Sequence, residues 1–233
     1  TKGVKVSKIQ SMKQNTKVYL EKKTSDEIIK VEKVLLAVGV TGNINNLGLE
    51  DLGIETEAGA IKTDNYNRTN IENIYAIGDV CGPPWLAHVA SAQGHLAAEH
   101  SAGLNVNPID YSNIPGCTYC QPQVGSLGMT EEQALSSGFK VKVGRFSFQA
   151  SGKAMAIGNT TGFVKLIFDE KYGELLGAHI VGSEATEMIA ELGMAKALES
   201  TWDDLSMTVH AHPTLSEAIM EAAMDAQGHS IHQ

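Results

Sequence analysis

The 233-residue sequence contains no Gly-x-Gly tripeptide and no Gly-x-x-x-x-Gly-Lys motif. Gly-rich turns of these kinds hold the pyrophosphate of a dinucleotide, or the phosphates of a nucleoside triphosphate, at a helix N-terminus. The chain therefore lacks the phosphate loop of either kind of site, and any nucleotide that it binds must be held partly by other groups.

Positive charge and long apolar runs are also scarce. Lys and Arg number 18 against 27 Asp and Glu, which gives a formal net charge of −9 and argues against a nucleic-acid partner. No apolar run approaches the roughly 20 residues of a membrane span, and no basic-then-apolar start resembles a signal peptide. The apolar fraction of 42% is ordinary for a globular protein. We expect no nucleic-acid and no membrane partner.

The chain has only three cysteines, Cys81, Cys117 and Cys120. The last two form a Cys-x-x-Cys sequence, which elsewhere can be a redox or zinc motif. Here they fall on a predicted strand at 114–119, where residues three apart point to opposite faces, and no second pair completes a zinc site. We interpret both as packing cysteines and predict no metal site.

The N-terminal stretch predicts strands. The chain starts at Thr1 without Met, inside a predicted strand, so we expect it to be part of a longer protein. Across residues 4–38, polar turns separate short alternating apolar segments, which predicts an antiparallel meander with one solvated face. Val34–Gly39 is different, because it is continuously apolar and predicts a strand buried on both faces.

A second apolar strand is predicted at Ile74–Ile77, followed by Gly and Asp79. At the carboxyl end of a parallel strand, Gly lets a ligand approach the backbone and Asp can accept a hydrogen bond from a ribose-type hydroxyl. In the alternative interpretation Asp79 only caps the following helix. That helix is predicted from Trp85–His88 to about Ala102, and its N-terminus offers free N–H groups at the positive end of the helix dipole.

A linker containing Pro and Asn, residues 105–113, predicts a domain boundary. Beyond it we predict strands at 114–119, 124–127, 141–148, 163–168 and 175–181, and helices at 130–137 and 184–199, the latter capped by Ser183. Strands followed by helices indicate an antiparallel sheet with helices on one face.

The stretch His210–Glu217 places two imidazoles, a proline and a carboxylate in eight residues. A helix is predicted directly after it, from Ala218 to Gln227, with Thr214 or Ser216 as its cap and Gly228 as its stop.

His212 and Glu217 are close enough for the carboxylate to hold one ring nitrogen and leave the other free, as in an oriented general base. Pro213 permits a cis peptide bond after His212. The alternative is a capping turn with surface histidines.

Two motifs carry a resemblance to a known family. His210–Glu217 (HAHPTLSE) resembles the C-terminal active-site signature of dihydrolipoyl dehydrogenases, and Thr69–Val80 (TNIENIYAIGDV) resembles the second FAD-binding motif of the same disulfide-reductase family. The resemblance covers nearly the whole chain but about the C-terminal half of a family member. Glutathione reductase shares His-Pro-Thr-x-x-Glu but usually lacks the preceding His-Ala and the following Leu-Ser. An inactive dimerisation fragment is the alternative from another class.

The resemblance implies an α/β region followed by an α+β domain. Residues 1–38 would end an NAD-binding domain, 39–110 would form the second segment of an FAD-binding domain, and 111–233 would form the interface domain. The family's redox Cys-x-x-x-x-Cys is absent from the sequence. We therefore expect this chain alone to be inactive and to retain neither FAD nor NAD tightly.

The resemblance also assigns roles. His212 would be the base that accepts a thiol proton and Glu217 its orienting carboxylate, in a site completed by a homodimer. The residues expected at FAD are Asp79, Trp85, Leu86, Ala87 and His88, and Gly39 is expected at NAD, although the following Val40–Asn43 departs from the family's Arg-Arg-Pro. The partner would be the lipoyl domain of a 2-oxoacid dehydrogenase complex, in a bacterial cytoplasm or a mitochondrial matrix.

Overall fold

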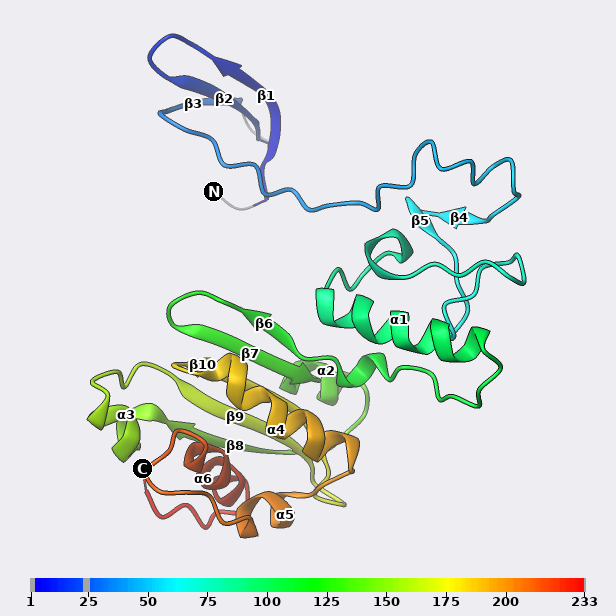
Figure 1. Ribbon diagram of the computed structural model, residues 1–233. Coiled ribbons are helices and arrows are strands. Elements are labelled where there is room, and N and C mark those ends of the chain that lie inside the picture. The colour runs from blue at the N-terminus through cyan, green and yellow to red at the C-terminus, as the bar shows by residue number, and fades with distance from the viewer. Residues whose placement is uncertain (1–2, 23–25, 233) are drawn as a thin grey trace.

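The computed structural model describes residues 3–22 and 26–232 (Figure 1). Its strands are β1 (Lys5–Ser11), β2 (Thr16–Glu21), β3 (Glu27–Val31), β4 (Thr56–Glu57), β5 (Ala60–Ile61), β6 (Gly116–Thr118), β7 (Gln123–Gly128), β8 (Val141–Ser147), β9 (Phe163–Asp169) and β10 (Leu175–Gly182). Its α-helices are α1 (Ala87–Ser101), α2 (Glu131–Ser136), α3 (Gly152–Ala156), α4 (Ala185–Ala197), α5 (Trp202–Met207) and α6 (Glu217–Ala226). Among these described residues, no helix combines the length and apolar character that crossing a bilayer requires.

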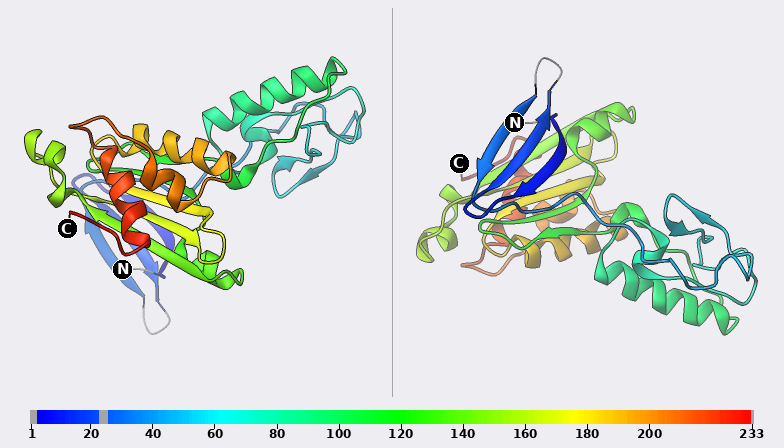
Figure 2. Two further views of the ribbon diagram at one scale, coloured as in Figure 1. Left: turned by 90° about the horizontal axis from the view of Figure 1, so that it is seen from below. Right: turned by 90° about the horizontal axis from the view of Figure 1, so that it is seen from above.

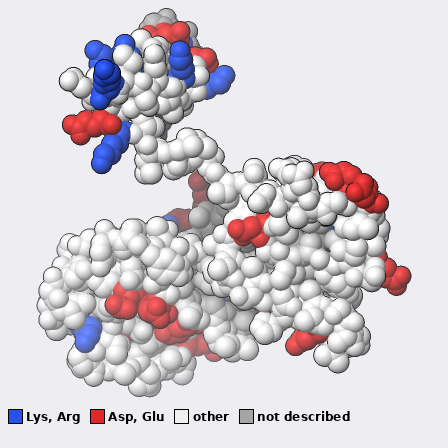
Figure 3. All heavy atoms as spheres, turned by 45° about the horizontal axis from the view of Figure 1, so that its top comes forward, with Lys and Arg blue, Asp and Glu red and all other residues white. Residues whose placement is uncertain are grey.

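The predicted N-terminal meander is confirmed. β1, β2 and β3 form a three-stranded antiparallel sheet in chain order, with Val18 of β2 opposite Ile9 on one side and Ile29 on the other. Its surface carries many lysines, and Figure 3 shows Lys and Arg gathered on this part of the molecule.

The prediction of a buried strand at Val34–Gly39 is wrong. Residues 33–44 have no regular secondary structure, and Leu35 and Val38 are 91% and 83% exposed. A strand buried on both faces needs neighbouring strands and covering helices, whereas the sheets of the described residues pair antiparallel within their own segments. The predicted strand at Ile74–Ile77 is also wrong, because only an isolated bridge between Arg68 and Tyr75 forms there.

The segment that follows is organised around α1, which runs as predicted. The helix ends at Ser101, Ala102 occupies the C-cap position, and the following Gly103 adopts a left-handed φ of 78°. Before the helix, the β4–β5 hairpin and adjoining turns enclose a small core made of Leu49, Ile54, Ile61 and Ala76.

The C-terminal part contains a five-stranded antiparallel sheet in the order β6-β7-β10-β9-β8. Helix α4 contacts β7 and β10, whereas α6 contacts β8 and β9, so the two helices lie side by side over one face (Figure 2, left). The predicted α+β fold class is confirmed. Short α2 covers part of the opposite face, where its Ala134 packs with Ile167 and Leu176.

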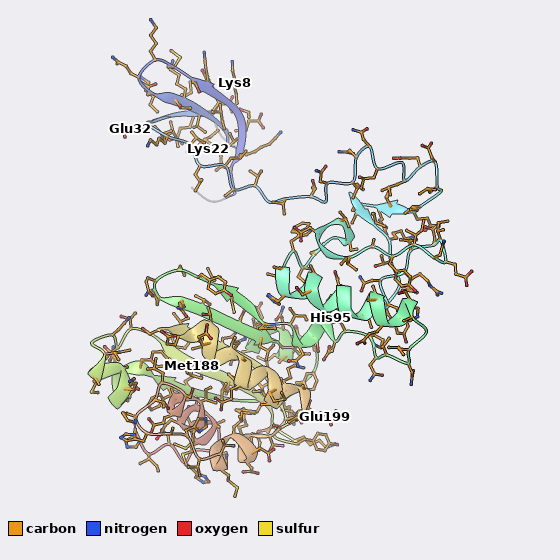
Figure 4. The ribbon with its side chains drawn as sticks, in the orientation of Figure 1. Lys8, Lys22, Glu32, His95, Met188 and Glu199 are labelled. Atoms are coloured by element: carbon orange, nitrogen blue, oxygen red, sulfur yellow. The ribbon has the colours of Figure 1, made fainter. Side chains whose placement is uncertain are left out.

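The main core lies between the sheet and the two long helices. Met188 of α4, labelled in Figure 4, is only 6% exposed. Large side chains that share this layer include Leu127, Phe146, Phe148, Val164, Leu166, Phe168, Leu175, Ile180, Ile189, Leu192 and Ile219. Burial of this layer fixes the positions of α4 and α6, because removal of apolar surface from water is the main favourable term in folding.

Two strand glycines let the helices approach the sheet closely. A Cβ atom at Gly125 would lie 2.5 Å from the Ala185 carbonyl oxygen of α4, and one at Gly144 would lie 1.8 Å from the Ala222 carbonyl oxygen of α6. Both contacts are with backbone, which cannot move aside as a side chain can. The position of α6 therefore depends on the absence of a side chain at Gly144.

The start predicted for α2 is confirmed, whereas the capping residue predicted for α4 is not. Thr130 caps α2 in a complete capping box, its side chain accepting from the Gln133 N–H. The prediction that Ser183 caps α4 is wrong: Glu184 occupies the cap position in a left-handed conformation with φ of 59°. The Ser183 hydroxyl instead accepts from Asn159 Nδ2 at 2.9 Å. The short helices α3 and α5 are not predicted from the sequence.

We expect Gly144→Ala to lower the free energy of unfolding by about 1–3 kcal/mol, since an inserted methyl group forces α6 away from β8. Gly193→Ala is the matched control, because a Cβ atom at this position in α4 meets nothing within 4 Å. Replacing glycine inside a helix should there stabilise the protein by about 0.5–1 kcal/mol. Denaturant unfolding of both variants measures the difference, and equal effects would contradict the proposed close approach.

Candidate active site

The loop between α5 and α6 presents the His212 side chain. The His212–Pro213 peptide bond is cis, and the Thr214 hydroxyl donates to the Ala211 carbonyl oxygen at 2.7 Å. The prediction that Thr214 or Ser216 caps α6 through its side chain is wrong. Ser216 occupies the cap position, but its side chain makes no capping bond.

Glu217, the first residue of α6, holds the loop instead. Its Oε1 accepts from His212 Nδ1 at 2.8 Å, and its Oε2 accepts from the Thr214 backbone N–H at 2.8 Å. The carboxylate therefore accepts hydrogen bonds from both the His212 ring and the loop backbone. No bond is found for His212 Nε2 in the described part of the chain, and the side chain is 78% exposed. This is the predicted arrangement, one nitrogen held and the other free to accept a proton.

The environment of Glu217 favours its charged form. Burial acts to raise the pKa of this carboxyl, but hydrogen bonds from the Thr214 N–H and from His212 outweigh burial. The net result is a pKa below the ordinary value of 4.5. Glu217 is therefore an anion at neutral pH, and its Oε1 orients the His212 ring.

The neighbouring His210 is placed differently. Its side chain is only 6% exposed, with Nε2 2.7 Å from Glu191 Oε1 and Nδ1 3.0 Å from the Thr208 carbonyl oxygen. Neither ring nitrogen is free, so His210 ties the loop to α4. Of the two histidines in the motif, His212 is the one available for proton transfer.

The dyad borders a cavity of about 320 Å³. Apolar side chains from β8, α3 and α6 line much of it, including Phe146, Met155 and Met220. Both glutamates of the first two turns of α6, Glu217 and Glu221, also face it. An apolar cavity beside an imidazole nitrogen suits a substrate with an alkyl chain and a group that must lose a proton.

Asp79 lies in a separate part of the molecule, on a short 3₁₀ helix at Gly78–Cys81. The Gly78 N–H donates to Gln93 Oε1 at 2.7 Å, and Gln93 Nε2 donates to the Tyr111 hydroxyl at 2.8 Å. Gln93 is only 6% exposed. This α1 residue, to which we assigned no role from the sequence, therefore fixes the turn that presents Asp79. The role of Gln93 could have been predicted from its sequence position, because it is a polar residue on the inward side of an otherwise apolar helix.

A cleft of about 530 Å³ adjoins this turn, lined by residues that include Thr41, Gly42, Gly82 and Trp85. A Cβ atom at Gly42 would lie 3.0 Å from the Gly59 carbonyl oxygen and 3.2 Å from that of Asp79, so a side chain there would crowd two backbone carbonyl groups. The first turn of α1 has neither a side-chain cap nor an acidic residue. Its N–H groups are therefore available, and the cleft, exposed Asp79 and helix start fit part of a flavin nucleotide.

The other predicted cofactor residues are less informative. His88 Nε2 donates to the Pro115 carbonyl oxygen at 3.0 Å, which ties α1 to the start of β6. Leu86 occupies the cap position of α1, and Ala87 is its first residue. Gly39 has a φ of 95° and is exposed. Contact of these residues with FAD or NAD stays a prediction.

The cysteines differ from one another. Cys117 packs against the main core, as predicted, but Cys120 is exposed, so its assignment as a packing cysteine is wrong. It follows the end of the short strand β6, and its Sγ lies 3.0 Å from the Pro122 carbonyl oxygen. Burial raises the pKa of the Cys81 thiol to about 11. Within residues 3–22 and 26–232, no three His, Cys, Asp or Glu side chains cluster to hold a metal ion.

Comparison with known families and proteins identifies the family of the chain. Residues 1–94 match the pyridine nucleotide-disulphide oxidoreductase family, and residues 114–223 match the dimerisation domain of the same family. The chain belongs to the pyridine nucleotide-disulphide oxidoreductase family. Membership implies the use of FAD and of NAD or NADP, and the dimerisation domain supports a homodimer.

Curated relatives include dihydrolipoyl dehydrogenase of Rhizobium etli, 50% identical over 97% of this chain and 47% of the relative. Another is dihydrolipoyl dehydrogenase of Bacillus subtilis, 45% identical over 92% of this chain and 45% of the relative. The chain thus spans about half the length of the curated relatives it matches.

Similar solved structures include LpdA from Mycobacterium tuberculosis, with a TM-score of 0.87 and 26% identity, over 94% of this chain and 48% of that one. The HOCl-induced flavoprotein disulfide reductase RclA from Escherichia coli gives a TM-score of 0.86 at 26% identity, over 94% of this chain and 50% of that one. Both neighbours support the fold described above.

The lowered pKa of Glu217 predicts a pH dependence of stability. Because the folded state favours the carboxylate, this contribution is present above the ordinary pKa of 4.5 and is lost as the pH falls through the lower, folded value. We expect Glu217→Gln to reduce the free energy of unfolding by about 1 kcal/mol at pH 7. The difference from the parent should shrink below pH 4.5 in denaturant titrations. A difference that stays constant or grows on acidification would contradict the assigned contacts.

Proposed function

We propose that the whole protein to which this chain belongs is a dihydrolipoyl dehydrogenase, which oxidises protein-bound dihydrolipoamide with NAD⁺. The observation that carries the proposal is the His212–Glu217 dyad, in which the carboxylate holds one ring nitrogen and both residues border a largely apolar cavity. The names of relatives that are 45–50% identical support the same choice. The redox disulfide and the Gly-rich loops would come from the part of the protein that this chain does not span.

In this proposal His212 Nε2 accepts a proton from one thiol of the substrate, since the thiolate is the competent nucleophile. The thiolate attacks one sulfur of the enzyme disulfide, the S–S bond breaks, and a mixed disulfide forms. The second substrate thiol then closes the substrate disulfide and leaves the enzyme as a dithiol, two electrons richer. Glu217 stabilises the imidazolium during the first transfer. When bound, FAD supplies the path by which the two electrons reach NAD⁺.

We assign the flavin contacts to Asp79 and to the start of α1, from Trp85 to His88. The cleft floor at Gly42 and the uncapped first turn of α1 support this assignment. NAD, rather than NADP, is the proposed acceptor, with Gly39 beside it. The proposed partners are a second copy of the protein, whose disulfide His212 serves, and a lipoyl domain of a 2-oxoacid dehydrogenase complex. We propose the cytoplasm of a bacterium, or a mitochondrial matrix, as the location.

A glutathione reductase is the nearest alternative within the family. Ala211, Leu215 and Ser216 complete the dihydrolipoyl dehydrogenase signature around His212 and favour the dithiol substrate. Leu215 is 7% exposed and packs in the main core. Turnover of dihydrolipoamide against that of glutathione disulfide by the whole protein separates the two functions.

We expect His212→Gln in the whole enzyme to reduce dihydrolipoamide oxidation by about 10² to 10⁴, the usual contribution of a general base. Flavin content and reduction of the flavin by NADH should stay near parental, because neither requires this base. Asp79→Ala supplies the contrast, since it should lower flavin content.

His210→Gln is the control for the neighbouring imidazole. It removes a partly buried contact with Glu191, so it should lower the melting temperature while reducing dithiol turnover far less than His212→Gln. Equal losses of turnover in the two histidine variants would mean that the base is assigned to the wrong ring.

A further inference from the structure

Helix α6 carries a second carboxylate one turn after Glu217. Glu221 Oε1 lies 2.6 Å from His232 Nδ1, and its Oε2 accepts from the His232 backbone N–H at 3.4 Å. Glu217 is held by the same two kinds of donor, an imidazole Nδ1 on one oxygen and a backbone N–H on the other. Two histidine–glutamate pairs of similar geometry therefore start from neighbouring turns of one helix.

Both pairs border the same cavity. Residues four apart lie on one face of a helix, and Glu217, Glu221, His212 and His232 all line the space of about 320 Å³ described above. The His232 side chain is 65% exposed, and no bond is found for its Nε2 in the described residues. The segment from Gly228 to His232 thus returns along α6, and its His232 supplies part of the cavity wall.

Glu221 has a strong requirement for this partner. The residue is 4% exposed, and a buried carboxylate without a hydrogen-bond donor is unfavourable. Within the described residues, both hydrogen bonds to its side chain come from His232. The buried carboxylate consequently holds His232 and the backbone around it at a defined place on the helix.

We propose that the His232–Glu221 pair is a second clamp, which holds His232 against α6 as part of the cavity wall and positions the dithiol substrate at His212 Nε2. His232 is a positioning residue here, because His212 performs the proton transfer. The inference rests on the proposed function, since it concerns the substrate of that site. Loss of the clamp widens the cavity and leaves the base intact, so it weakens substrate binding more than the chemical step.

The test compares four variants in the whole enzyme. His232→Ala and Glu221→Gln both break the clamp and should raise the KM for dihydrolipoamide roughly tenfold, with a smaller change in kcat. His232→Asn keeps an N–H donor near the Nδ1 position and should restore most of the parental KM. His229→Ala is the matched control, because His229 is exposed and is not among the residues of the cavity wall. NADH oxidation by an artificial acceptor should not change in any variant.

Several outcomes would overturn the proposal. The clamp has no role in positioning if KM in His232→Ala stays within about twofold of the parent, or if His229→Ala raises it equally. A matching loss in the NADH reaction would indicate general damage instead. His232→Ala alone leaves the buried Glu221 carboxylate without a donor and could destabilise the fold. The double variant Glu221→Gln/His232→Ala controls for this effect, because it removes the buried charge together with its partner. It should show the same KM as either single variant, and additive effects would contradict a shared contact.

Failure of the proposed function can be recognised separately. A parental enzyme that does not oxidise dihydrolipoamide would refute the proposed function and, with it, the substrate-positioning role. Amide hydrogen exchange over residues 229–232 then still decides whether the clamp exists. We expect faster exchange in His232→Ala than in His229→Ala, and equal exchange would refute the clamp itself.

Discussion

The candidate active site depends on one carboxylate that accepts two hydrogen bonds. Glu217 fixes the His212 ring through Nδ1 and the loop backbone through the Thr214 N–H, so the direction of the free Nε2 follows from the position of this side chain. Since Glu217 is the first residue of α6, the position of the helix determines the position of the Glu217 carboxylate and of the His212 ring. The contact of α6 with the backbone of β8 at Gly144 sets that placement. Core packing and proton transfer are thereby linked through a single helix.

Much of this architecture could be predicted from local sequence patterns. The meander, the β9–β10 hairpin and helices α1, α4 and α6 all have a clear apolar period and polar or Gly boundaries, and they lie within a few residues of their predicted bounds. The His212–Glu217 contact was also predictable, because five residues of separation across a helix start limit where the carboxylate can reach. These sequence patterns are local, so they can be interpreted without knowledge of the tertiary fold.

The errors share a physical cause, which is dependence on distant residues. Val34–Gly39 has the composition of a buried strand, but a strand forms only where neighbours pair with it, and the described residues provide none. Ser183 is a good capping residue by type, yet Asn159 engages its hydroxyl. Gln93 and His232 were missed because their partners, Gly78 and Glu221, lie 15 and 11 residues away. Side-chain contacts at such separations are set by packing and not by sequence spacing.

In the proposed whole enzyme, His212 serves the redox disulfide of the other subunit in a dimer. Hybrid dimers test it most directly, with His212→Gln in one subunit and a serine replacing a disulfide cysteine in the other, each subunit carrying a different affinity tag. Both parent homodimers lack a complete site. We expect the purified hybrid to regain dihydrolipoamide oxidation, because one of its two sites joins an intact His212 to an intact disulfide. A hybrid as inactive as both homodimers would contradict the account.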